Sequence, residues 1–296
     1  MSPNPTATRE GRIPIGEAGL FYRDVGTGPP ILVLHGGPDF DFNYLLPDLD
    51  RLADSFRLLY YDQRGRGRSA EGVRPSDVSL RSEVDDVEAV RAYFGLDSVA
   101  LLGHSFGALL AAEYAIRHPA RVSHLILASP APLSRSDYLF LREEFGRRRP
   151  GADAARMKEL AASDAYAKGD PETTAEYNRI HFTMGLRRAA DLDRLMKSLT
   201  AGFTSEGILK ARAIEDRLRE ETWLLDDYDL LPALRRLAIP ALVIHGDHDL
   251  IPLACAAHAA EAIPGARLVV LEDCGHFGYL EMPDAFGRGV RALFGR

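Results

Sequence analysis

The chain has 296 residues, of which 46% are hydrophobic and 27% charged, and its formal net charge is −7. These proportions exclude a disordered or fibrous chain, and the length suits two domains or one large domain with an insertion. The acidic balance disfavours a nucleic-acid-binding surface, and two cysteines, Cys255 and Cys274, are too few for a disulfide framework or a zinc ribbon.

The apolar runs of the chain are short. None approaches the roughly 20 residues that a membrane-spanning helix needs. Residues 1–12 are polar, contain proline and lack the apolar stretch of a secretion signal. We therefore expect a cytoplasmic protein without a nucleic-acid or membrane partner. The sequence does not indicate an oligomeric state.

Strands and helices alternate along most of the chain. Two short strands with a turn near 17–19 are expected within residues 11–25. Apolar residues at helical spacing predict helices over 80–94 and 108–117. Continuous apolar runs, which are typical of strands buried on both faces, occur at 31–35, 56–61, 99–103, 122–129, 241–245 and 268–271. This order predicts an α/β fold with a mostly parallel central sheet flanked by helices.

The alternation stops between residues 133 and 229. This stretch is rich in Arg, Glu, Ala and Leu, shows helical periodicity at 154–162 and 208–219, and contains no buried-strand pattern. We interpret it as a helical cap domain, 133–229, inserted into a core domain formed by 1–132 and 230–296. The alternative is that these helices belong to the outer layer of the core. A cap would cover the carboxyl ends of the strands, where open α/β sheets place their sites.

Residues 103–107 read GHSFG, a G-x-S-x-G motif between a predicted strand and a predicted helix. In that context the motif holds a serine on a sharp turn with its hydroxyl exposed at the edge of the sheet. The glycines leave room for the turn, and the helix N-terminus favours negative charge near the serine. Ser105 is therefore the candidate nucleophile.

A serine nucleophile needs a base and an acid that orients the base, in the chain order Ser, acid, His for this architecture. Residues 245–252 (HGDHDLIP) and 274–277 (CGHF) each follow a predicted strand. We assign Asp249 as the acid and His276 as the base.

Two alternatives concern the same loop. Asp247 lies two residues from Asp249 and is the second candidate for the acid. His245, Asp247, His248 and Asp249 are also potential metal ligands, but their spacing matches no zinc signature, so we expect neither a metal nor a cofactor. The other histidines are interpreted as structural: His35, His104, His118, His124, His181 and His258.

Acyl transfer also requires donors for an oxyanion. The backbone N–H after the nucleophile, that of Phe106, supplies one, and a loop after an early strand supplies the other. Residues 35–39 (HGGPD) form such a loop, and we assign its donor to Gly37. Taken alone, HGGPD would be read as an ordinary Gly-Pro turn.

Two arginine-rich segments are interpreted as structural. Residues 62–69 (DQRGRGRS) lack both phosphate-binding glycine spacings, so we expect a turn held by Arg–carboxylate pairs near the site. Residues 147–149 (RRR) are interpreted as a solvated face of the cap.

These motifs resemble the α/β-hydrolase superfamily over nearly the whole chain. HGGPD and DQRGRGRS are similar to segments of the proline iminopeptidase group, although that group often has GGSWG where this chain has GHSFG, and Gly where it has Asp39. The resemblance implies a cofactor-independent serine hydrolase that removes a small N-terminal residue from short peptides or arylamides. The alternatives are a carboxylesterase or lactonase acting on small-molecule esters, and a slow-turnover ligand sensor on a hydrolase scaffold.

An exopeptidase must recognise the amine at the substrate's end. A shielded carboxylate of the cap would pair with it. The candidates are Glu176, Glu206, Glu215, Glu220 and Glu221, and the sequence does not distinguish among them.

Overall fold

The computed structural model describes residues 8–16 and 18–296, and within them eight strands form one sheet in the order β1-β2-β4-β3-β5-β6-β7-β8. β1 (Arg9–Ile15) and β2 (Ala18–Val25) form an antiparallel hairpin at one edge, and β2 also pairs antiparallel with β4. They are the two strands expected within 11–25, while Glu17 of the expected turn lies outside the described residues.

The other strands pair in parallel from β4 to β8. They are β3 (Pro30–Leu34), β4 (Arg57–Tyr61), β5 (Val99–His104), β6 (Val122–Ala128), β7 (Ala241–Gly246) and β8 (Arg267–Leu271). Each corresponds to one of the six apolar runs, so the prediction of a mostly parallel sheet is confirmed.

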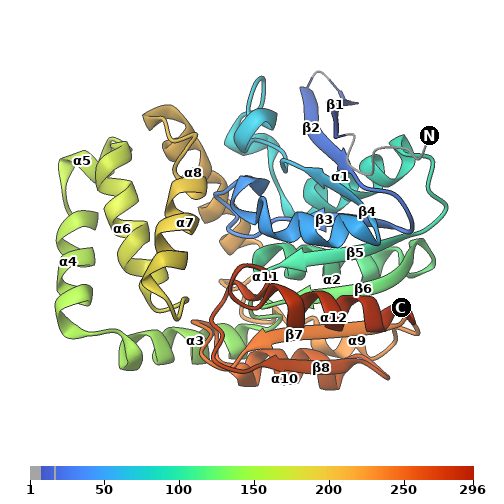
Figure 1. Cartoon of the computed structure of the whole chain (residues 1–296). Coiled ribbons are helices and arrows are strands. Elements are labelled where there is room, and N and C mark those ends of the chain that lie inside the picture. Colours follow the sequence, from blue (N-terminus) through green and yellow to red (C-terminus); the bar gives the residue numbers. More distant parts are fainter. Residues whose placement is uncertain (1–7, 17) are drawn as a thin grey trace.

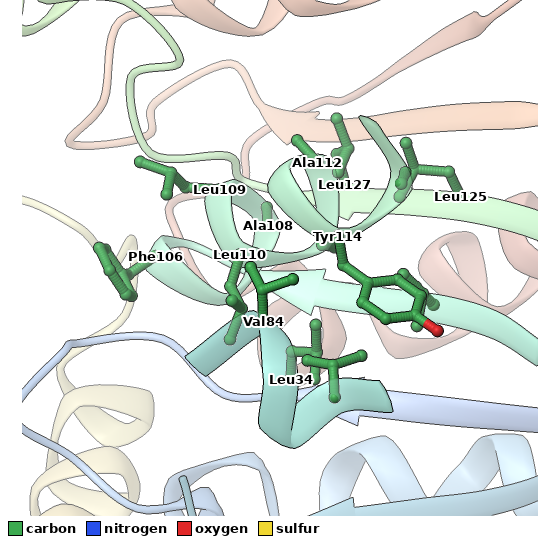
Figure 2. Packing of buried hydrophobic residues seen from close by; sticks show 14 of the residues in the cluster. Leu34, Val84, Phe106, Ala108, Leu109, Leu110, Ala112, Tyr114, Leu125 and Leu127 are labelled. Atoms are coloured by element: carbon green, nitrogen blue, oxygen red, sulfur yellow. The ribbon is translucent and has the colours of Figure 1, made fainter. Parts of the chain in front are cut away.

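The central strands are apolar throughout because helices cover both faces of the sheet. Leu32 and Leu34 of β3 face one hydrophobic core, whereas Ile31 and Val33 face the other. Figure 2 shows part of the first core, where side chains of α2, Val84 of α1 and Leu34 of β3 come together. The covering helices include α1 (Leu80–Tyr93), α2 (Phe106–Arg117), α10 (Leu253–Ala262) and α12 (Pro283–Leu293).

Helices alone connect β6 to β7, apart from an isolated bridge between Ser134 and Asp229. They are α3 (Arg135–Arg148), α4 (Gly151–Ala161), α5 (Asp164–Ala167), α6 (Pro171–Thr183), α7 (Ala189–Leu199), α8 (Ser205–Glu220) and α9 (Leu231–Leu234). We call α3–α8 the helical segment. α4 and α8 confirm the two helices expected there, and Figure 1 shows α4–α7 beyond one end of the sheet.

Within the described part of the chain, no helix is both long and apolar enough to cross a membrane. The helical segment lies at the end of the sheet where β3, β5, β7 and β8 finish. The loops that follow these four strands carry the predicted site residues, so the fold brings them to one place.

Candidate active site

Ser105 stands on a sharp turn between β5 and α2. Its backbone has φ 56° and ψ −118°, a conformation that costs a non-glycine residue about 1–3 kcal/mol. The turn can form because residues 103 and 107 are glycines and have no Cβ. A Cβ on Gly103 would lie 2.2 Å from the Gly107 carbonyl oxygen, and one on Gly107 would lie 2.1 Å from the Leu34 carbonyl oxygen. The G-x-S-x-G spacing therefore follows from the close contact of α2 with β5 and β3.

The loops after β7 and β8 bring an acid and a histidine together. His276 Nδ1 lies 2.8 Å from Asp249 Oδ1, and both side chains are buried. Burial alone would raise the pKa of the Asp249 carboxyl. The neighbouring His276 and His245 rings, together with the hydrogen bonds from His276 and the Ile251 N–H, instead hold this pKa well below its usual range. Asp249 is therefore an anion, suited to accept the Nδ1–H of His276.

The alternative acid has other partners. The Asp247 carboxylate accepts the N–H groups of Asp273 and Cys274, both at 3.1 Å, and lies 2.7 Å from His248 Nδ1. Asp247 thus ties the two loops together, while Asp249 contacts His276. Among the described residues, no group of three His, Cys, Asp or Glu side chains is placed to hold a metal ion.

The loop after β3 offers the second backbone donor predicted for an oxyanion. Gly36 donates its N–H to Tyr44 Oη at 2.6 Å, so this N–H is already used. Gly37 follows with φ +56°, and its carbonyl oxygen accepts the Phe40 N–H at 2.9 Å. Gly37 and Phe106 line the same cavity as Ser105 and His276. The N–H of Gly37 thus remains the candidate donor of this loop.

His104, which the sequence analysis treated only as structural, connects three loops of the site. Tyr44 Oη lies 2.8 Å from His104 Nδ1, and His104 Nε2 lies 3.0 Å from the His276 carbonyl oxygen. Burial, together with the charge of His276, lowers the pKa of His104 to about 3, so the ring is neutral. Because Tyr44 Oη accepts the Gly36 N–H, the Tyr44 hydroxyl donates its own proton to His104 Nδ1. The His104 Nε2–H donates to the His276 carbonyl oxygen.

The helical segment also holds the catalytic loops in place. The His276 N–H donates to the Gly185 carbonyl oxygen at 2.7 Å. Arg148 donates to the carbonyl oxygens of Asp249 at 2.8 Å and Leu250 at 3.4 Å. Sequence reasoning missed these contacts because they use backbone groups, which carry no residue signature.

The prediction that residues 147–149 form a solvated face is therefore wrong for two of the three arginines. Arg147 is exposed and pairs with Glu144. Arg148 binds the acid loop, and Arg149 lines the cavity. A helix turns by about 100° per residue, so consecutive arginines at its end point in different directions.

The turn formed by residues 62–69 is confirmed as one held by Arg–carboxylate pairs. Arg66 and Glu83 form a fully buried pair at 2.8 Å, Arg68 pairs with Asp62, and Arg64 pairs with Asp86. The same turn supports the loop after β3, because Gln63 donates its side-chain amide to the His35 carbonyl oxygen at 2.8 Å.

A cavity of about 1100 Å³ opens above Ser105 and His276, between the strand ends and the helical segment. A volume of this size accommodates a small molecule or a short peptide. Much of its wall is apolar, with contributions from Phe40, Phe145, Phe182, Leu199, Phe203, Ile208 and Trp223.

Two carboxylates line this cavity, and the charge of one acts on the other. Asp39, at the end of the HGGPD loop, and Glu215, on α8, both line it. Burial, together with the charge of Glu215, raises the pKa of Asp39 to about 8. Burial also raises the pKa of Glu215, with Asp216 adding to the effect and Arg219 and Arg212 opposing it.

The five glutamates proposed for amine recognition lie in different surroundings in the structure. Glu206 and Glu215 line the cavity. Glu176 pairs with Arg156 at the surface, Glu221 accepts the Leu80 N–H, and Glu220 is exposed. The sequence analysis did not include Asp39 among these candidates because it lies in the core and not in the proposed cap. Its place at the end of an oxyanion loop was the signal available.

Known proteins resemble the chain in sequence and in structure. A family model described as alpha/beta hydrolase fold matches residues 29–283. A proline iminopeptidase of Saccharolobus solfataricus is 28% identical over 274 residues, which cover 90% of this chain and 84% of that protein.

Two solved structures extend the comparison. A proline iminopeptidase of Mycobacterium smegmatis superimposes with a TM-score of 0.73 at 22% identity, covering 97% of this chain and 98% of the other. An enol-lactonase of Burkholderia xenovorans has a TM-score of 0.67 at 24% identity, covering 97% and 100%. At these identities the solved structures establish a shared fold. The match of the family model to residues 29–283 establishes membership of the family. The chain belongs to the α/β-hydrolase family, and it is a hydrolase-type protein whose curated relatives include proline iminopeptidases.

Proposed function

We propose that the protein is a serine hydrolase that works through an acyl-enzyme and releases a small N-terminal residue from short peptides or arylamides. The observation that carries the proposal is the pair of carboxylates, Asp39 and Glu215, in the cavity that also contains Ser105 and His276. A hydrolase of uncharged esters gains nothing from two acidic groups beside its nucleophile. A peptidase that requires a free terminal amine does.

The proposed chemistry uses the candidate triad of Ser105, Asp249 and His276. His276 takes the proton of Ser105 as the Ser105 oxygen attacks the carbonyl carbon, and the Gly37 and Phe106 N–H groups stabilise the resulting oxyanion. The C–N bond then breaks, and His276 returns the proton to the leaving amine. Water attacks the acyl-enzyme with His276 as the base, and the released amino acid leaves Ser105 protonated again. Asp249 keeps the Nδ1–H tautomer of His276 throughout.

The carboxylate pair supplies the preference for a terminal amine. Two nearby carboxylates repel each other when both are ionised, and the raised pKa of Asp39 reflects this together with its burial. A substrate ammonium group placed between them stabilises both anions. A blocked or internal peptide lacks that cation and would leave the repulsion between the two carboxylates in place, because the Arg219–Glu215 pair at 3.9 Å offsets only part of it, and this favours rejection.

We further propose that residues 133–229 act as a cap domain for this site. Glu215 and most of the apolar wall come from this stretch, and the Ser134–Asp229 bridge brings its two ends together. A small-molecule or short-peptide substrate would bind between the cap and the strand ends, without a cofactor or metal.

The test compares kcat/KM on proline arylamide, alanine arylamide, their N-acetylated forms and a short-chain aryl ester. We expect the free-amine arylamides to exceed their acetylated forms by about 30-fold or more, the size of a lost charged contact. Equal rates for free and blocked substrates would move the assignment to a carboxylesterase or amidase. A single slow turnover on every substrate would indicate a ligand sensor.

A matched pair of variants on α8 locates the effect. Glu215→Gln removes a charge in the cavity, whereas Glu220→Gln removes one from the exposed end of the same helix. We expect Glu215→Gln to lower kcat/KM for free-amine substrates by at least about 10-fold and to leave the aryl ester nearly unchanged. Glu220→Gln should resemble the unmodified protein on both. The amine-binding role of Glu215 is contradicted if the two variants behave alike.

A further inference from the structure

The cavity is lined by arginines as well as by carboxylates, and Arg149 lies on a different part of the wall from Asp39 and Glu215. The end of α3, which carries Arg148 and Arg149, contacts the acid loop, because Arg148 donates to the Asp249 carbonyl oxygen. α8, which carries Glu215, contacts the turn after β4, because Lys210 Nζ donates to the Ala70 carbonyl oxygen at 3.0 Å. We call the part of the wall that contains Arg142 and Arg149 the positive pole.

The positive pole is built on one face of α3. Tyr138, Leu141, Arg142 and Phe145 recur at helical spacing on α3, Arg149 follows as the C-cap residue of the helix, and all five line the cavity. Arg142 and Arg149 are thus directed to the same space from positions two turns apart. They differ from Arg147, which points to solvent and pairs with Glu144.

Arg149 is held in place but not neutralised. Its guanidinium stacks near the Phe145 ring, and one of its terminal nitrogens lies 3.4 Å from His181 Nδ1. Burial and the charge of Arg149 lower the pKa of His181 to about 4, so the ring is a neutral acceptor. Arg149 Nε is buried without a hydrogen-bond partner, and no carboxylate among the described residues forms a salt bridge with Arg149 or Arg142.

The position of this pole relative to the triad identifies the part of the substrate that it would meet. In acyl transfer the histidine that activates serine also protonates the leaving group, so the leaving group departs beside His276. The His181 ring is linked to the His276 ring through Phe182 and Phe277, with successive centroids 4.9, 5.5 and 5.1 Å apart, and His181 contacts Arg149 directly. Asp39, by contrast, belongs to the HGGPD loop and lies two residues after Gly37, the candidate oxyanion donor.

We propose that Arg149, assisted by Arg142, binds an anionic group on the leaving portion of the substrate, and that the preferred substrate is a short peptide with a free C-terminal carboxylate. A guanidinium forms paired hydrogen bonds with a carboxylate, and such contacts strengthen where water is excluded. This inference deepens the proposed peptidase function and rests on it for the identity of the substrate. The specificity for the leaving group can be tested independently of that function.

The experiment uses substrates that differ in one charge. The first set contains Pro-Ala and Pro-Ala-Ala, each as the free acid and as the C-terminal amide. The second set contains the acetyl esters of 4-hydroxybenzoate and 4-hydroxybenzamide, which have no terminal amine. Product release is followed by chromatography, and the readout is the ratio of kcat/KM for the anionic member to that for the neutral member.

Two variants of neighbouring arginines provide the comparison. We expect the unmodified protein to favour the free-acid peptides by about 10-fold or more, Arg149→Gln to reduce this ratio to about 2-fold or less, and Arg147→Gln to leave it unchanged. Arg149→Gln should act mainly through the anionic substrates, so its kcat/KM should fall more for the anionic members than for the neutral ones. Arg147→Gln should leave kcat/KM unchanged for every member, and the thermal midpoint of each variant reports whether it has folded normally.

The outcomes separate the two proposals. Equal kcat/KM for acids and amides in the unmodified protein, or the same ratio in Arg149→Gln and Arg147→Gln, would overturn the anionic-leaving-group proposal while leaving the peptidase assignment intact. If no peptide is hydrolysed but the hydroxybenzoate ester is preferred and Arg149→Gln abolishes that preference, the charge inference is supported and the peptidase assignment is the part that fails.

Discussion

The strand-end loops and the helical segment contribute to the same cavity in different ways. On the strand-end side, the candidate catalytic pair and the groups that support it are bonded within the protein: Asp249 to His276, His104 to Tyr44, and Asp247 to the loop that carries His276. On the helical side, the charged groups that line the cavity include Glu215, which opposes Asp39, and Arg149, whose Nε has no partner.

This difference corresponds to two requirements of a hydrolase. Catalytic groups must be fixed before the substrate arrives, and the His276 ring is already held by Asp249 Oδ1 in the free protein. Groups that select a substrate must gain an interaction on binding, so in the free protein Asp39 carries the repulsion of Glu215 and Arg149 Nε has no partner, although Glu215 itself lies 3.9 Å from Arg219. The following predictions test whether the two sides of the cavity divide the work in this way.

The largest effect is expected from Ser105→Ala. Removing the hydroxyl removes the attacking atom and leaves only the oxyanion donors and substrate binding, so kcat should fall by about 10⁴- to 10⁶-fold. Substrate affinity and the thermal midpoint should change little, since alanine fits the turn. Steady-state kinetics and a thermal melt measure the two effects. A well-folded variant with near-normal turnover would rule out the serine mechanism.

The next effect distinguishes two acids of one loop. Asp249→Asn places an amide where His276 Nδ1–H is accepted and stabilises the wrong tautomer of the ring, so kcat should fall by about 10⁴-fold. Asp247→Asn weakens a link between loops and should cost less than about 10-fold. The two variants are measured on the same arylamide over a range of pH. A larger loss in Asp247→Asn would contradict our assignment of the acid.

The strand-end side could be predicted from sequence because its chemistry is local. GHSFG, HGDHDLIP and CGHF each place a reactive residue within a few positions of a buried strand end. A parallel sheet brings strand ends together, so the fold itself assembles Ser105, Asp249 and His276. The steric reason for the glycines at 103 and 107 is equally local.

The helical side could not be predicted in the same way. Asp39 and Glu215 are distant in the chain, and nothing near either residue indicates the other. Three consecutive arginines, 147–149, look equivalent in sequence, yet one is solvated, one binds the acid loop and one lines the cavity. Which side of a helix meets a cavity depends on packing between elements, and a run of charged residues carries no periodic signal for it.

A smaller effect is expected where the helical segment supports the strand-end side. Arg148→Gln removes the donor to the Asp249 and Leu250 carbonyl oxygens, so the acid loop loses a contact that fixes the Asp249–His276 pair. We expect kcat to fall by about 5- to 10-fold with KM nearly unchanged, because the substrate contacts remain. Arg147→Gln is the matched control and should leave both constants unaltered.

A conservative variant completes this test. Arg148→Lys retains a donor that reaches the same carbonyl oxygens and should restore part of kcat. If Arg148→Gln changes the thermal midpoint but not kcat, Arg148 contributes only to stability, and the two sides of the cavity are less interdependent than the contacts indicate.

The smallest effect concerns stability at the carboxylate pair. Burial and Glu215 raise the pKa of Asp39 to about 8 from an ordinary value near 4, so the folded protein binds this proton more tightly than the unfolded chain does. Stability must then fall as the pH rises from about 4 to about 8, because folding holds the carboxylate in an unfavourable place. Asp39→Asn removes the charge and that pH dependence. We expect its thermal midpoint to match that of the unmodified protein near pH 4 and to exceed it by a few degrees at pH 8.5.

Asp85→Asn, at an exposed position of α1, is the control and should show no such divergence from the unmodified protein. Parallel pH profiles for Asp39→Asn and the unmodified protein would mean that Asp39 ionises freely in the folded state. The carboxylate pair would then lose its role as a poised receptor for an amine.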